Sequence, residues 1–493
     1  MNGPGHDKVR ILTLGTGVPG LDEVLGGGVP QLSFNLIVGA PGCGKTTLGA
    51  QIAFANGTVE RPALHIGLIG EPPLKMLRYQ QQYSFFDASK VGNAVQFLHL
   101  GDEARSGGLG HVLERIAAEV SRINPAIVVV DSFRALARQA TVQTNDLEMQ
   151  DFVQRLAMNL TTCEATTFLL GEYEAHEQGN PVFTIADGII FLQQSVERNS
   201  IVRKLQVVKM RGQGQIPGLH TIRITSDGLV VFPRLLKPEE LSTTDNVLAH
   251  RVTTGIPPLD EMLGGGLPRG YSALIAGPSG SGKTVLSNEF ILEGARLGEP
   301  GIIAVFEKRP NDYMQTTPHG HEFEQLIAKK QLEIIYLRPL DLSIDEALLA
   351  IRDAVARIGA KRAVIDSLSG LELALAPTFR EDFRESLYRM VGALTSVGVT
   401  VLSTVELSDS FTDLHFSPHG IAFLTDAIIM QRYIELDGVL TRAMTVVKVR
   451  GSDHSKQLRE YEITGRGVIR VGGVLKGYEG LLSGKAVRTE DHR

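Results

Sequence analysis

The sequence of 493 residues contains only two cysteines, no long apolar run and no surplus of basic side chains. Cys43 and Cys163 are too few for a disulfide framework or a cysteine zinc site, which indicates a reducing compartment. The longest apolar runs, such as 126–130 and 188–192, fall far below the ~18 residues that a membrane span needs. The N-terminal residues also lack the apolar core of a signal peptide. We therefore expect a cytoplasmic protein without a membrane segment.

The balance of charge argues against another class of protein. Lysine and arginine number 49 against 55 aspartates and glutamates, which gives a net charge of −6 at pH 7. A strongly basic nucleic-acid-binding protein would show the opposite balance, although a local basic patch is compatible with this one. With 43% hydrophobic and 21% charged residues, the composition is typical of a globular protein, and the length suits two domains.

The sequence does contain one phosphate-binding motif twice. Segments 39–46 and 277–284 both fit G-x-x-x-x-G-K-[ST] and begin 238 residues apart (277 minus 39). The longer segments 16–48 and 254–286, which include these motifs, are identical at 19 of 33 positions. An isolated match has some chance of being accidental, but two matches in register within a long repeat indicate that a whole nucleotide-binding domain was duplicated.

Each half shows the alternation of strands and helices that is typical of an α/β fold. An apolar strand precedes each phosphate-binding loop (P-loop), at 34–38 and 273–276, and amphipathic helices are predicted over 109–120 and 347–358. Further strands are predicted at 65–69, 127–131, 167–170 and 189–192 in the first half and at 302–306, 363–366, 399–402 and 427–430 in the second. Because continuous apolar strands are covered on both faces, we predict two tandem P-loop NTPase domains with mainly parallel, helix-covered sheets.

The domain limits follow from composition. We place the first domain at 8–232 and the second at 250–475, joined by a polar, proline-bearing linker at 233–249. The polar C-terminal tail, 476–493, is expected to lack regular structure.

The two P-loops provide the predicted ATP contacts. Their glycines let backbone N–H groups surround phosphate oxygens at the start of a helix, and Lys45 and Lys283 reach the outer phosphates. Thr46 and Thr284 would place a hydroxyl on Mg²⁺. The predicted ATP-binding residues are Gly39, Gly42, Cys43, Gly44, Lys45, Thr46, Thr47 and Asp131 in the first domain and Gly277, Gly280, Ser281, Gly282, Lys283, Thr284, Val285 and Asp366 in the second.

Acidic residues end or follow two of the predicted strands in each half. Asp131 and Asp366 come 86 and 83 residues after the P-loop lysines (131 minus 45, 366 minus 283), where an acid holds the water shell of Mg²⁺. A lone aspartate at a strand end is more often a cap or turn residue, but recurrence at matched spacing favours the functional interpretation. Glu71 and Glu307 come at the end of the earlier strand, the one after the P-loop helix, and are the candidate general bases, the alternative being solvated strand-end glutamates. Glu307 is also a candidate Mg²⁺ ligand.

Two basic pairs also recur in the repeat. Lys209 and Arg211 are matched 239 residues later by Lys448 and Arg450 (448 minus 209). Residues i and i+2 of a strand point to one face, and two cations on one face suit a phosphate, including a phosphate bound by a neighbouring subunit. The alternative is a solvated strand face.

A metal site at His319 and His321 is a weaker hypothesis. Two histidines without a cysteine neighbour give little support for a metal ion, so the segment 318–321 is expected to be an ordinary loop.

Together these features resemble the KaiC family of the RecA-like ATPase superfamily over nearly the whole chain. The resemblance rests on both Thr-Gly-x-Pro-x-Leu-Asp-Glu openings, both P-loops, the Asp-Ser pairs at 131–132 and 366–367, and both Lys-x-Arg-Gly strands. The second half adds the segments 425–429 and 451–454.

The resemblance implies two RecA-like domains that bind ATP and Mg²⁺ and assemble as a homohexameric double ring, with ATP between adjacent subunits. In such a ring, Lys209, Arg211, Lys448 and Arg450 would act on the neighbour's ATP, and Ser452 and His454 would belong to the same interface. It also implies a KaiB-like or two-component signalling partner.

The departures from the family pattern concern hydrolysis and phosphorylation. The clock protein carries two adjacent glutamates after the second strand, whereas Gly70-Glu71 and Glu307-Lys308 keep one acid each, so the two sites are expected to turn over differently. The clock protein also autophosphorylates adjacent Ser and Thr residues. Here Ala422 and Phe423 occupy those positions. Ser410, Thr412 and Ser417 are the nearby hydroxyl-bearing alternatives.

The main hypothesis is therefore an ATP-hydrolysing, KaiC-like hexameric ATPase of the signalling or clock type. One alternative is a serine/threonine autokinase of the KaiC type. Another is a RecA-like DNA-dependent motor or recombinase, against which the net negative charge argues. A nucleotide-dependent scaffold with little catalysis in the first domain is the fourth possibility.

Overall fold

The computed structural model describes residues 11–68, 73–106, 108–132, 146–173, 182–197, 200–234, 250–337, 342–375, 377–380, 383–407, 424–436, 438–480 and 487–488. The chain divides into two compact units, Met1–Arg234 and Leu235–Arg493. Of the predicted linker, residues 235–249 lie outside the described part of the chain. No described helix is both long and apolar enough to cross a bilayer.

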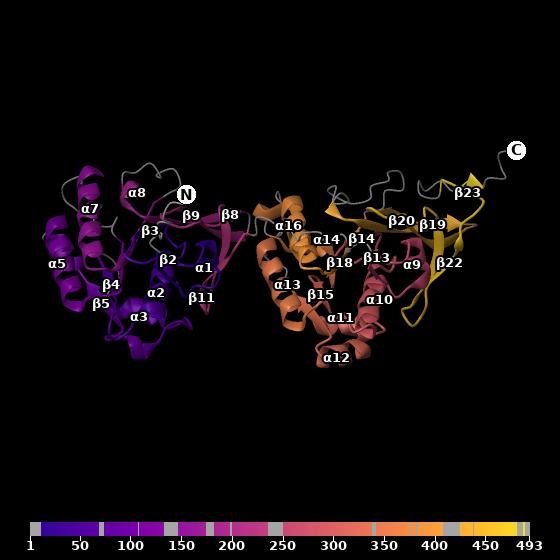
Figure 1. The fold of residues 1–493 in the computed structure, drawn as a ribbon, viewed down its shortest axis with the longest axis horizontal. Coiled ribbons are helices and arrows are strands. Elements are labelled where there is room, and N and C mark those ends of the chain that lie inside the picture. Colours follow the sequence, from indigo (N-terminus) through magenta and orange to yellow (C-terminus); the bar gives the residue numbers. More distant parts are fainter. Residues whose placement is uncertain are drawn as a thin grey trace, which may run out of the picture. The chain divides into compact units, whose positions relative to one another are not determined.

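The first unit, drawn from indigo to magenta in Figure 1, is built on a nine-stranded sheet. The strand order is β11-β10-β9-β8-β3-β7-β6-β4-β5. Its parallel strands are β3 (Phe34–Gly39), β4 (Ala63–Gly67), β5 (Val95–His99), β6 (Ile127–Asp131), β7 (Thr166–Gly171) and β8 (Gly188–Glu197). An antiparallel extension follows in β9 (Ser200–Met210), β10 (His220–Thr225) and β11 (Gly228–Phe232). Around the sheet lie β1 (Thr13–Leu14), β2 (Val29–Pro30), α1 (Leu21–Val24), α2 (Lys45–Asn56), α3 (Pro73–Gln80), η1 (Ala88–Lys90), α4 (Gly101–Ser106), α5 (Gly108–Ile123), α7 (Asp146–Thr162) and α8 (Val182–Ile185).

Both faces of this sheet are buried, which explains the uninterrupted apolar strands. Successive side chains of a strand point to opposite faces. Leu36 and Val38 pack into a cluster with α5 and α7, whereas Ile37 between them packs into a second cluster with α2. A parallel strand covered in this way has no polar face, so the fold-class prediction from the sequence is confirmed.

The repeated opening motif forms a small cap beside the sheet. Asp22 accepts hydrogen bonds from the backbone N–H and the hydroxyl of Thr16, at 2.8 and 2.7 Å. The glycines that follow α1 have positive φ, and a Cβ on Gly28 (φ +107°) would lie 2.4 Å from the carbonyl oxygen of Leu14. The motif is thus conserved between the two repeats for a structural reason, because the turn is too tight for other residues.

The second unit repeats the architecture, with the sheet order β16-β15-β17-β18-β14-β19-β20-β21-β22. Its strands are β12 (Arg251–Val252), β13 (Leu267–Pro268), β14 (Ser272–Gly277), β15 (Gly301–Val305), β16 (Leu332–Tyr336), β17 (Arg362–Asp366), β18 (Thr400–Glu406), β19 (Ala427–Leu436), β20 (Val439–Val449), β21 (Arg459–Ile463), β22 (Ile469–Val474), β23 (Tyr478–Glu479) and β24 (Val487–Arg488). Its helices are α9 (Pro257–Met262), α10 (Lys283–Arg296), α11 (Pro310–Thr316), α12 (Gly320–Ala328), α13 (Ile344–Ile358), α14 (Leu368–Ala374), α15 (Pro377–Arg380) and α16 (Phe383–Ser396).

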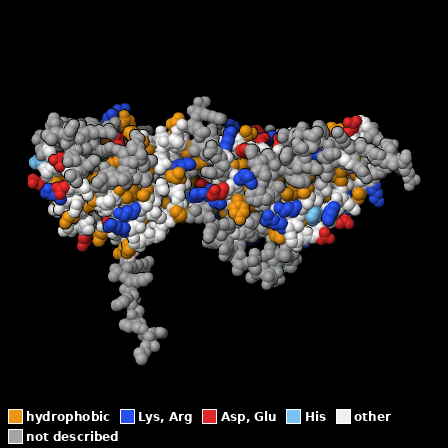
Figure 2. All heavy atoms as spheres, turned by 90° about the horizontal axis from the view of Figure 1, so that it is seen from above, with side chains coloured by type: hydrophobic (Ala, Val, Ile, Leu, Met, Phe, Trp, Pro, Cys, Tyr) orange, Lys and Arg blue, Asp and Glu red, His pale blue; other side chains and the backbone are white. Residues whose placement is uncertain are grey.

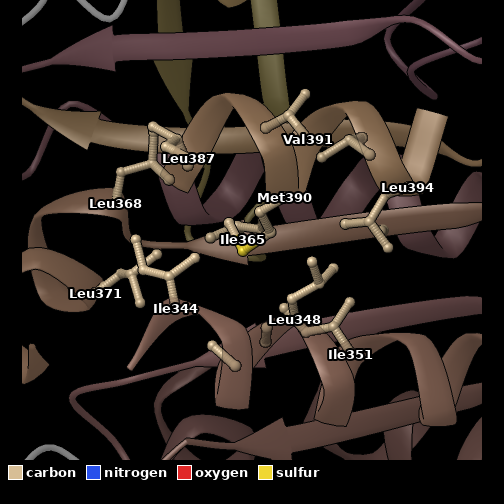
Figure 3. Packing of buried hydrophobic residues seen from close by; sticks show 14 of the residues in the cluster. Ile344, Leu348, Ile351, Ile365, Leu368, Leu371, Leu387, Met390, Val391 and Leu394 are labelled. Carbon is tan, nitrogen blue, oxygen red and sulfur yellow. The ribbon is translucent and has the colours of Figure 1, made fainter. Parts of the chain in front are cut away.

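One core of the second unit lies between its sheet and the helices α13, α14 and α16. Figure 3 shows Ile351 of α13 and Leu394 of α16 near the strand that carries Ile365. On the other face, Phe290 of α10 belongs to a separate buried cluster. Helix α13 begins at a capping box, in which Ser343 and Glu346 bond each other's backbone N–H groups at 3.1 and 2.7 Å.

Several segments differ from the sequence predictions, among them β4, β18 and the tail. Strand β4 begins at Ala63, two residues before the predicted start. Strand β18 runs on to Glu406, past Ser403 and Thr404, because these polar side chains are buried rather than exposed. The tail was expected to lack regular structure, yet β23 pairs with β24 in an antiparallel ladder.

Candidate nucleotide-binding sites

The first candidate site is a cavity of about 370 Å³ where β3 leads into the P-loop and α2. Gly44 caps the helix with a φ of +107°, and the backbone N–H groups at this helix end have no intrahelical partner. Such an end binds anions through these N–H groups and the helix dipole. The lining residues are Pro41, Gly42, Gly44, Lys45, Thr46, Thr47, Tyr83, Asp131, Ser132, Glu172 and Ile224.

The loop holds its lysine in place before any phosphate binds. Lys45 is 7% exposed, and its Nζ donates to the carbonyl oxygens of Gly39 and Ala40 at 2.9 Å each. Thr46 Oγ1 donates to Asp131 Oδ2 at 2.7 Å, which brings together two residues 85 apart in sequence. The sequence predicted separate Mg²⁺ roles for these two residues, and the structure brings them together.

The second candidate site is a cavity of about 420 Å³ at the P-loop between β14 and α10. Lys283 Nζ donates to the carbonyl oxygens of Gly277 and Pro278 at 2.9 and 2.7 Å. Burial lowers the pKa of Lys283, and the negative charges of Glu406, Asp366 and Glu307 oppose that effect. The lining residues are Ser279, Gly280, Gly282, Lys283, Thr284, Val285, Asn288, Val305, Glu307, Lys308, Tyr313, Thr316, Thr317, Pro318, Asp366, Ser367, Glu406 and Ile463.

Hydroxyl groups orient the aspartate of this site. Thr284 Oγ1 donates to Asp366 Oδ2 at 2.9 Å, and Thr404 Oγ1 donates to Asp366 Oδ1 at 2.6 Å. Buried Tyr313 lies beside them and donates its hydroxyl to Asn288 Oδ1 at 2.7 Å. Burial raises the pKa of Tyr313 well above its ordinary value, so the phenol stays neutral and donates.

The structure describes only one of the two predicted general bases. Glu307 lines the second cavity, and its Oε1 accepts a hydrogen bond from Ser367 Oγ at 3.4 Å. Glu71 and Gly70 lie outside the described residues. The predicted difference between the two sites at this position therefore stays a prediction.

Some predicted contacts lie beneath the loops rather than in the cavities. Cys43 is fully buried against the first P-loop, and this burial raises the pKa of its thiol. Ser281, at the same position of the second loop, is also fully buried and donates to Gln431 Oε1 at 3.1 Å. These two side chains support the loops, and neither residue lines either of the two cavities.

The basic pairs lie at the opposite end of the sheet from the P-loop of their own unit. Lys209 on β9 pairs with Ile189 on β8, and Ile189 pairs with Leu36 on β3. Leu36 lies three residues, or about 10 Å along the strand, before Gly39, where the P-loop begins. Arg211 contacts Asp187 at 3.0 Å, and Lys209 donates to the carbonyl oxygen of Ala186 at 2.5 Å. Neither basic residue lines the cavity of its own unit.

The second unit repeats this arrangement. Arg450 contacts Asp426 at 3.4 Å, and Lys448 donates to the carbonyl oxygen of Thr425 at 2.6 Å. Asp426 also accepts from the backbone of Ser272, the first residue of β14, at 3.0 Å. Ser272 lies five residues, or about 16 Å along β14, before Gly277, where the P-loop begins.

The remaining predicted residues are placed as follows. Ser452 accepts a hydrogen bond from Arg251 Nη2 at 2.5 Å, and the backbone of His454 donates to Asp453 Oδ1 at 3.0 Å. His319 has acidic neighbours in space, with Nε2 3.3 Å from Glu289 Oε1. Among the described residues, no group of three or more His, Cys, Asp or Glu side chains is placed to hold a metal ion.

Sequence reasoning missed several residues that line the cavities. Glu172 and Glu406 follow or end the strands β7 and β18, 41 and 40 residues after the aspartates (172 minus 131, 406 minus 366). Their matched position in the repeat was a usable signal. Tyr83, Ile224 and Ile463 also line the cavities, but single aromatic or aliphatic residues in a globular chain give no such signal.

Comparisons with known proteins agree with this geometry. A model of the KaiC ATPase family matches residues 14–235 and again 252–474. The circadian clock oscillator protein KaiC of Picosynechococcus sp. is 28% identical over 495 residues, which covers 98% of this chain and 93% of the relative. The circadian clock oscillator protein KaiC 1 of Synechocystis sp. is 28% identical over 502 residues, covering 99% and 94%. With a family match across both halves, the chain belongs to the KaiC family of ATPases.

Proposed function

We propose that this KaiC-family ATPase binds ATP and Mg²⁺ in both cavities and hydrolyses ATP in each. The support is the same constellation in both halves, namely a P-loop lysine held by loop carbonyls and a threonine bonded to a strand-end aspartate. A cavity of about 370 or 420 Å³ lies in front of each set.

The donor set in each cavity fits Mg²⁺. Thr46 Oγ1 and Asp131 Oδ2 are hard oxygen donors 2.7 Å apart, and Thr284 and Asp366 repeat the pair at 2.9 Å. We assign the threonines to the ion and the aspartates to its water shell. When bound, the ion neutralises charge on the β- and γ-phosphate oxygens. Glu307 is a further candidate ligand in the second site.

The protein's own residues hold the phosphates and orient the attacking water. Lys45 and Lys283 exchange loop carbonyls for the outer phosphate oxygens, and the P-loop N–H groups hold the β-phosphate. Glu307 accepts a hydrogen bond from the attacking water, and Glu71 is assigned the same role in the first site. Phosphoryl transfer of this kind depends mainly on positioning and charge stabilisation, which rigid loops provide.

We further propose that the sites are completed between subunits of a homohexameric double ring. The observation that carries this proposal is the position of the basic pairs, at the end of the sheet opposite to their own P-loop. The arginine side chains Arg211 and Arg450 are 61% and 54% exposed. A cation in this position can reach a phosphate held by a neighbouring copy, as an arginine finger does. Ser452 and His454 are assigned to the same interface.

Mixing two inactive chains tests the shared site. In a Lys45→Ala background, which leaves only the second site, we expect Lys283→Ala and Arg450→Ala each to abolish turnover. In 1:1 mixed rings, about a quarter of the interfaces would join an intact P-loop to an intact Arg450, because the interface is head-to-tail. ATP turnover should therefore return to about a quarter of the Lys45→Ala value.

A matched control and two outcomes complete the test. Arg470→Ala removes an exposed arginine from the same unit and should leave turnover unchanged. Mixed rings that stay inactive would contradict the proposal that Arg450 acts on a neighbour. Turnover retained by Lys283→Ala in the Lys45→Ala background would contradict the ATP-site assignment itself.

Two alternatives are weaker. A DNA-dependent motor needs a continuous basic track, whereas the described residues on the face in Figure 2 show lysine and arginine scattered among acidic and hydrophobic side chains. The autokinase hypothesis concerns residues 408–423, which lie outside the described part of the chain, so it stays a prediction. A clock-type signalling role is proposed from the relatives that are named circadian clock oscillator proteins. The cytoplasmic location and the KaiB-like or two-component partner are proposed from the sequence and its resemblance to the family.

A further inference from the structure

Among the acidic residues that line the second cavity, Glu406 is the one that ends the strand next to the P-loop strand. The sheet order there is β15-β17-β18-β14, and the P-loop follows β14. Glu406 is the last residue of β18 and pairs with Gly277, the first residue of the P-loop. Glu307 follows β15, three strand spacings or about 14 Å from β14, whereas β18 is one spacing or about 4.8 Å away.

The contacts of Glu406 place its side chain at the cavity and do not give that side chain a structural role. It lines the cavity beside Lys283, and its side chain is exposed. Its backbone N–H donates to Ser369 Oγ at 3.2 Å, which fixes the end of the strand. The charge of Glu406 acts on the P-loop lysine, as does that of Asp366. A carboxylate near this lysine also lies near the place of the terminal phosphate.

The first unit repeats this placement. Strand β7 pairs with β3 up to Gly171 opposite Val38, so Glu172 and Gly39 are the next residues on the two chains. Glu172 lines the first cavity together with Lys45. Two carboxylates at the same register position of two diverged halves are unexpected if each is only a solvated strand end.

We propose that Glu406, and Glu172 in the first domain, are catalytic residues that orient the water attacking the terminal phosphate. This inference rests on the ATPase function proposed above and adds a second acid to each site. In the second site the water is then held between Glu406 and Glu307, which approach the cavity from different strands.

The chemical step is hydrolysis of the terminal phosphoanhydride. The water oxygen forms a bond to the γ-phosphorus, while the bond from that phosphorus to the β–γ bridging oxygen breaks and its electron pair stays on ADP. The proton that leaves the water passes to the carboxylate and from there to the inorganic phosphate. The carboxylate returns to its ionised form, so no further reactant is needed.

Charge-removing variants of the full chain test the proposal one site at a time. Glu406→Gln is made in a Lys45→Ala chain and Glu172→Gln in a Lys283→Ala chain, each compared with its own background. We expect kcat to fall about 100-fold, the lower end for loss of a general base. Binding of a fluorescent ATP analogue should stay within about threefold or become tighter, because only a negative charge near the phosphates is lost.

The control is Glu435→Gln, which neutralises an exposed glutamate of β19 that lines neither cavity. It should leave kcat unchanged. An unchanged kcat in Glu406→Gln and Glu172→Gln, or a change in ATP affinity alone, would overturn the catalytic role. That result would leave the proposed function intact, whereas turnover that survives Lys45→Ala and Lys283→Ala together would refute the function itself.

Discussion

The stability of the second unit should depend strongly on one buried arginine. Arg362, the first residue of β17, is 1% exposed. Its Nε donates to Glu299 Oε2 at 2.8 Å, and its Nη1 donates to the carbonyl oxygens of Thr253 and Phe290 at 2.8 Å each. The guanidinium also lies over the ring of Phe290, 4.7 Å from the ring centroid. The side chain therefore joins β17 to α10 and to the start of the unit.

The expected magnitude follows from what its removal leaves behind. Arg362→Met fills much of the volume but leaves two buried carbonyl oxygens and a mostly buried Glu299 without this partner. Breaking a buried ion pair from one side costs about 3–5 kcal/mol. A domain is stable by only about 5–15 kcal/mol, so this loss is a large fraction of the total. Glu299 keeps a contact with Arg269, whose side chain is 44% exposed.

The assay uses Arg269→Met as the matched control, since it removes an exposed arginine from the same carboxylate. That variant should cost about 1 kcal/mol or less. Urea unfolding is monitored by hydrogen exchange of peptides from β17 and from β6, which measures the stability of each unit separately. An equal cost for Arg362→Met and Arg269→Met would refute the argument from burial, as would loss of protection in β6 rather than β17.

Two further predictions concern pH and helix capping. Burial lowers the pKa of His220, whose Nδ1 accepts from the backbone of Arg234 at 2.8 Å. The neutral ring thus stabilises the first unit above the unfolded pKa near 6.5, and this contribution is lost as the pH falls through the lower folded value, so its melting temperature should drop between pH 7.5 and 5. An unchanged melting temperature of this unit between pH 7.5 and 5 would contradict the prediction for His220. Ser343→Ala removes the capping box of α13 and should cost about 1 kcal/mol in urea unfolding, whereas Ser343→Thr should cost less; equal costs would argue against the cap.

Most of the fold was predictable because buried parallel strands leave continuous apolar runs. The strand predicted at 127–131 has the bounds of β6, Ile127–Asp131, in the structure. The edge strands β5 and β16 were missed, because their residues are only half-buried and include polar side chains such as Gln96 and Glu333. A mixed pattern of this kind does not distinguish a strand from a loop.

The site was predictable where a motif constrains several residues at once. Matched spacing in the repeat singled out the P-loop threonines and the strand-end aspartates, and the structure places each threonine in a hydrogen bond with its aspartate. Glu406 was missed because a single acid at a strand end matches no motif, and only its matched position with Glu172 in the repeat singles it out. The sequence also could not reveal that Glu289 lies beside His319, since the two are brought together only by the packing of α10 against the start of α12.

Nucleotide-binding stoichiometry tests the central claim that one chain holds two ATP sites. With a fluorescent ATP analogue and Mg²⁺, the unaltered chain should bind two nucleotides, Lys45→Ala and Lys283→Ala one each, and the double variant none. Two nucleotides on the double variant, or a single nucleotide on the unaltered chain, would contradict the account.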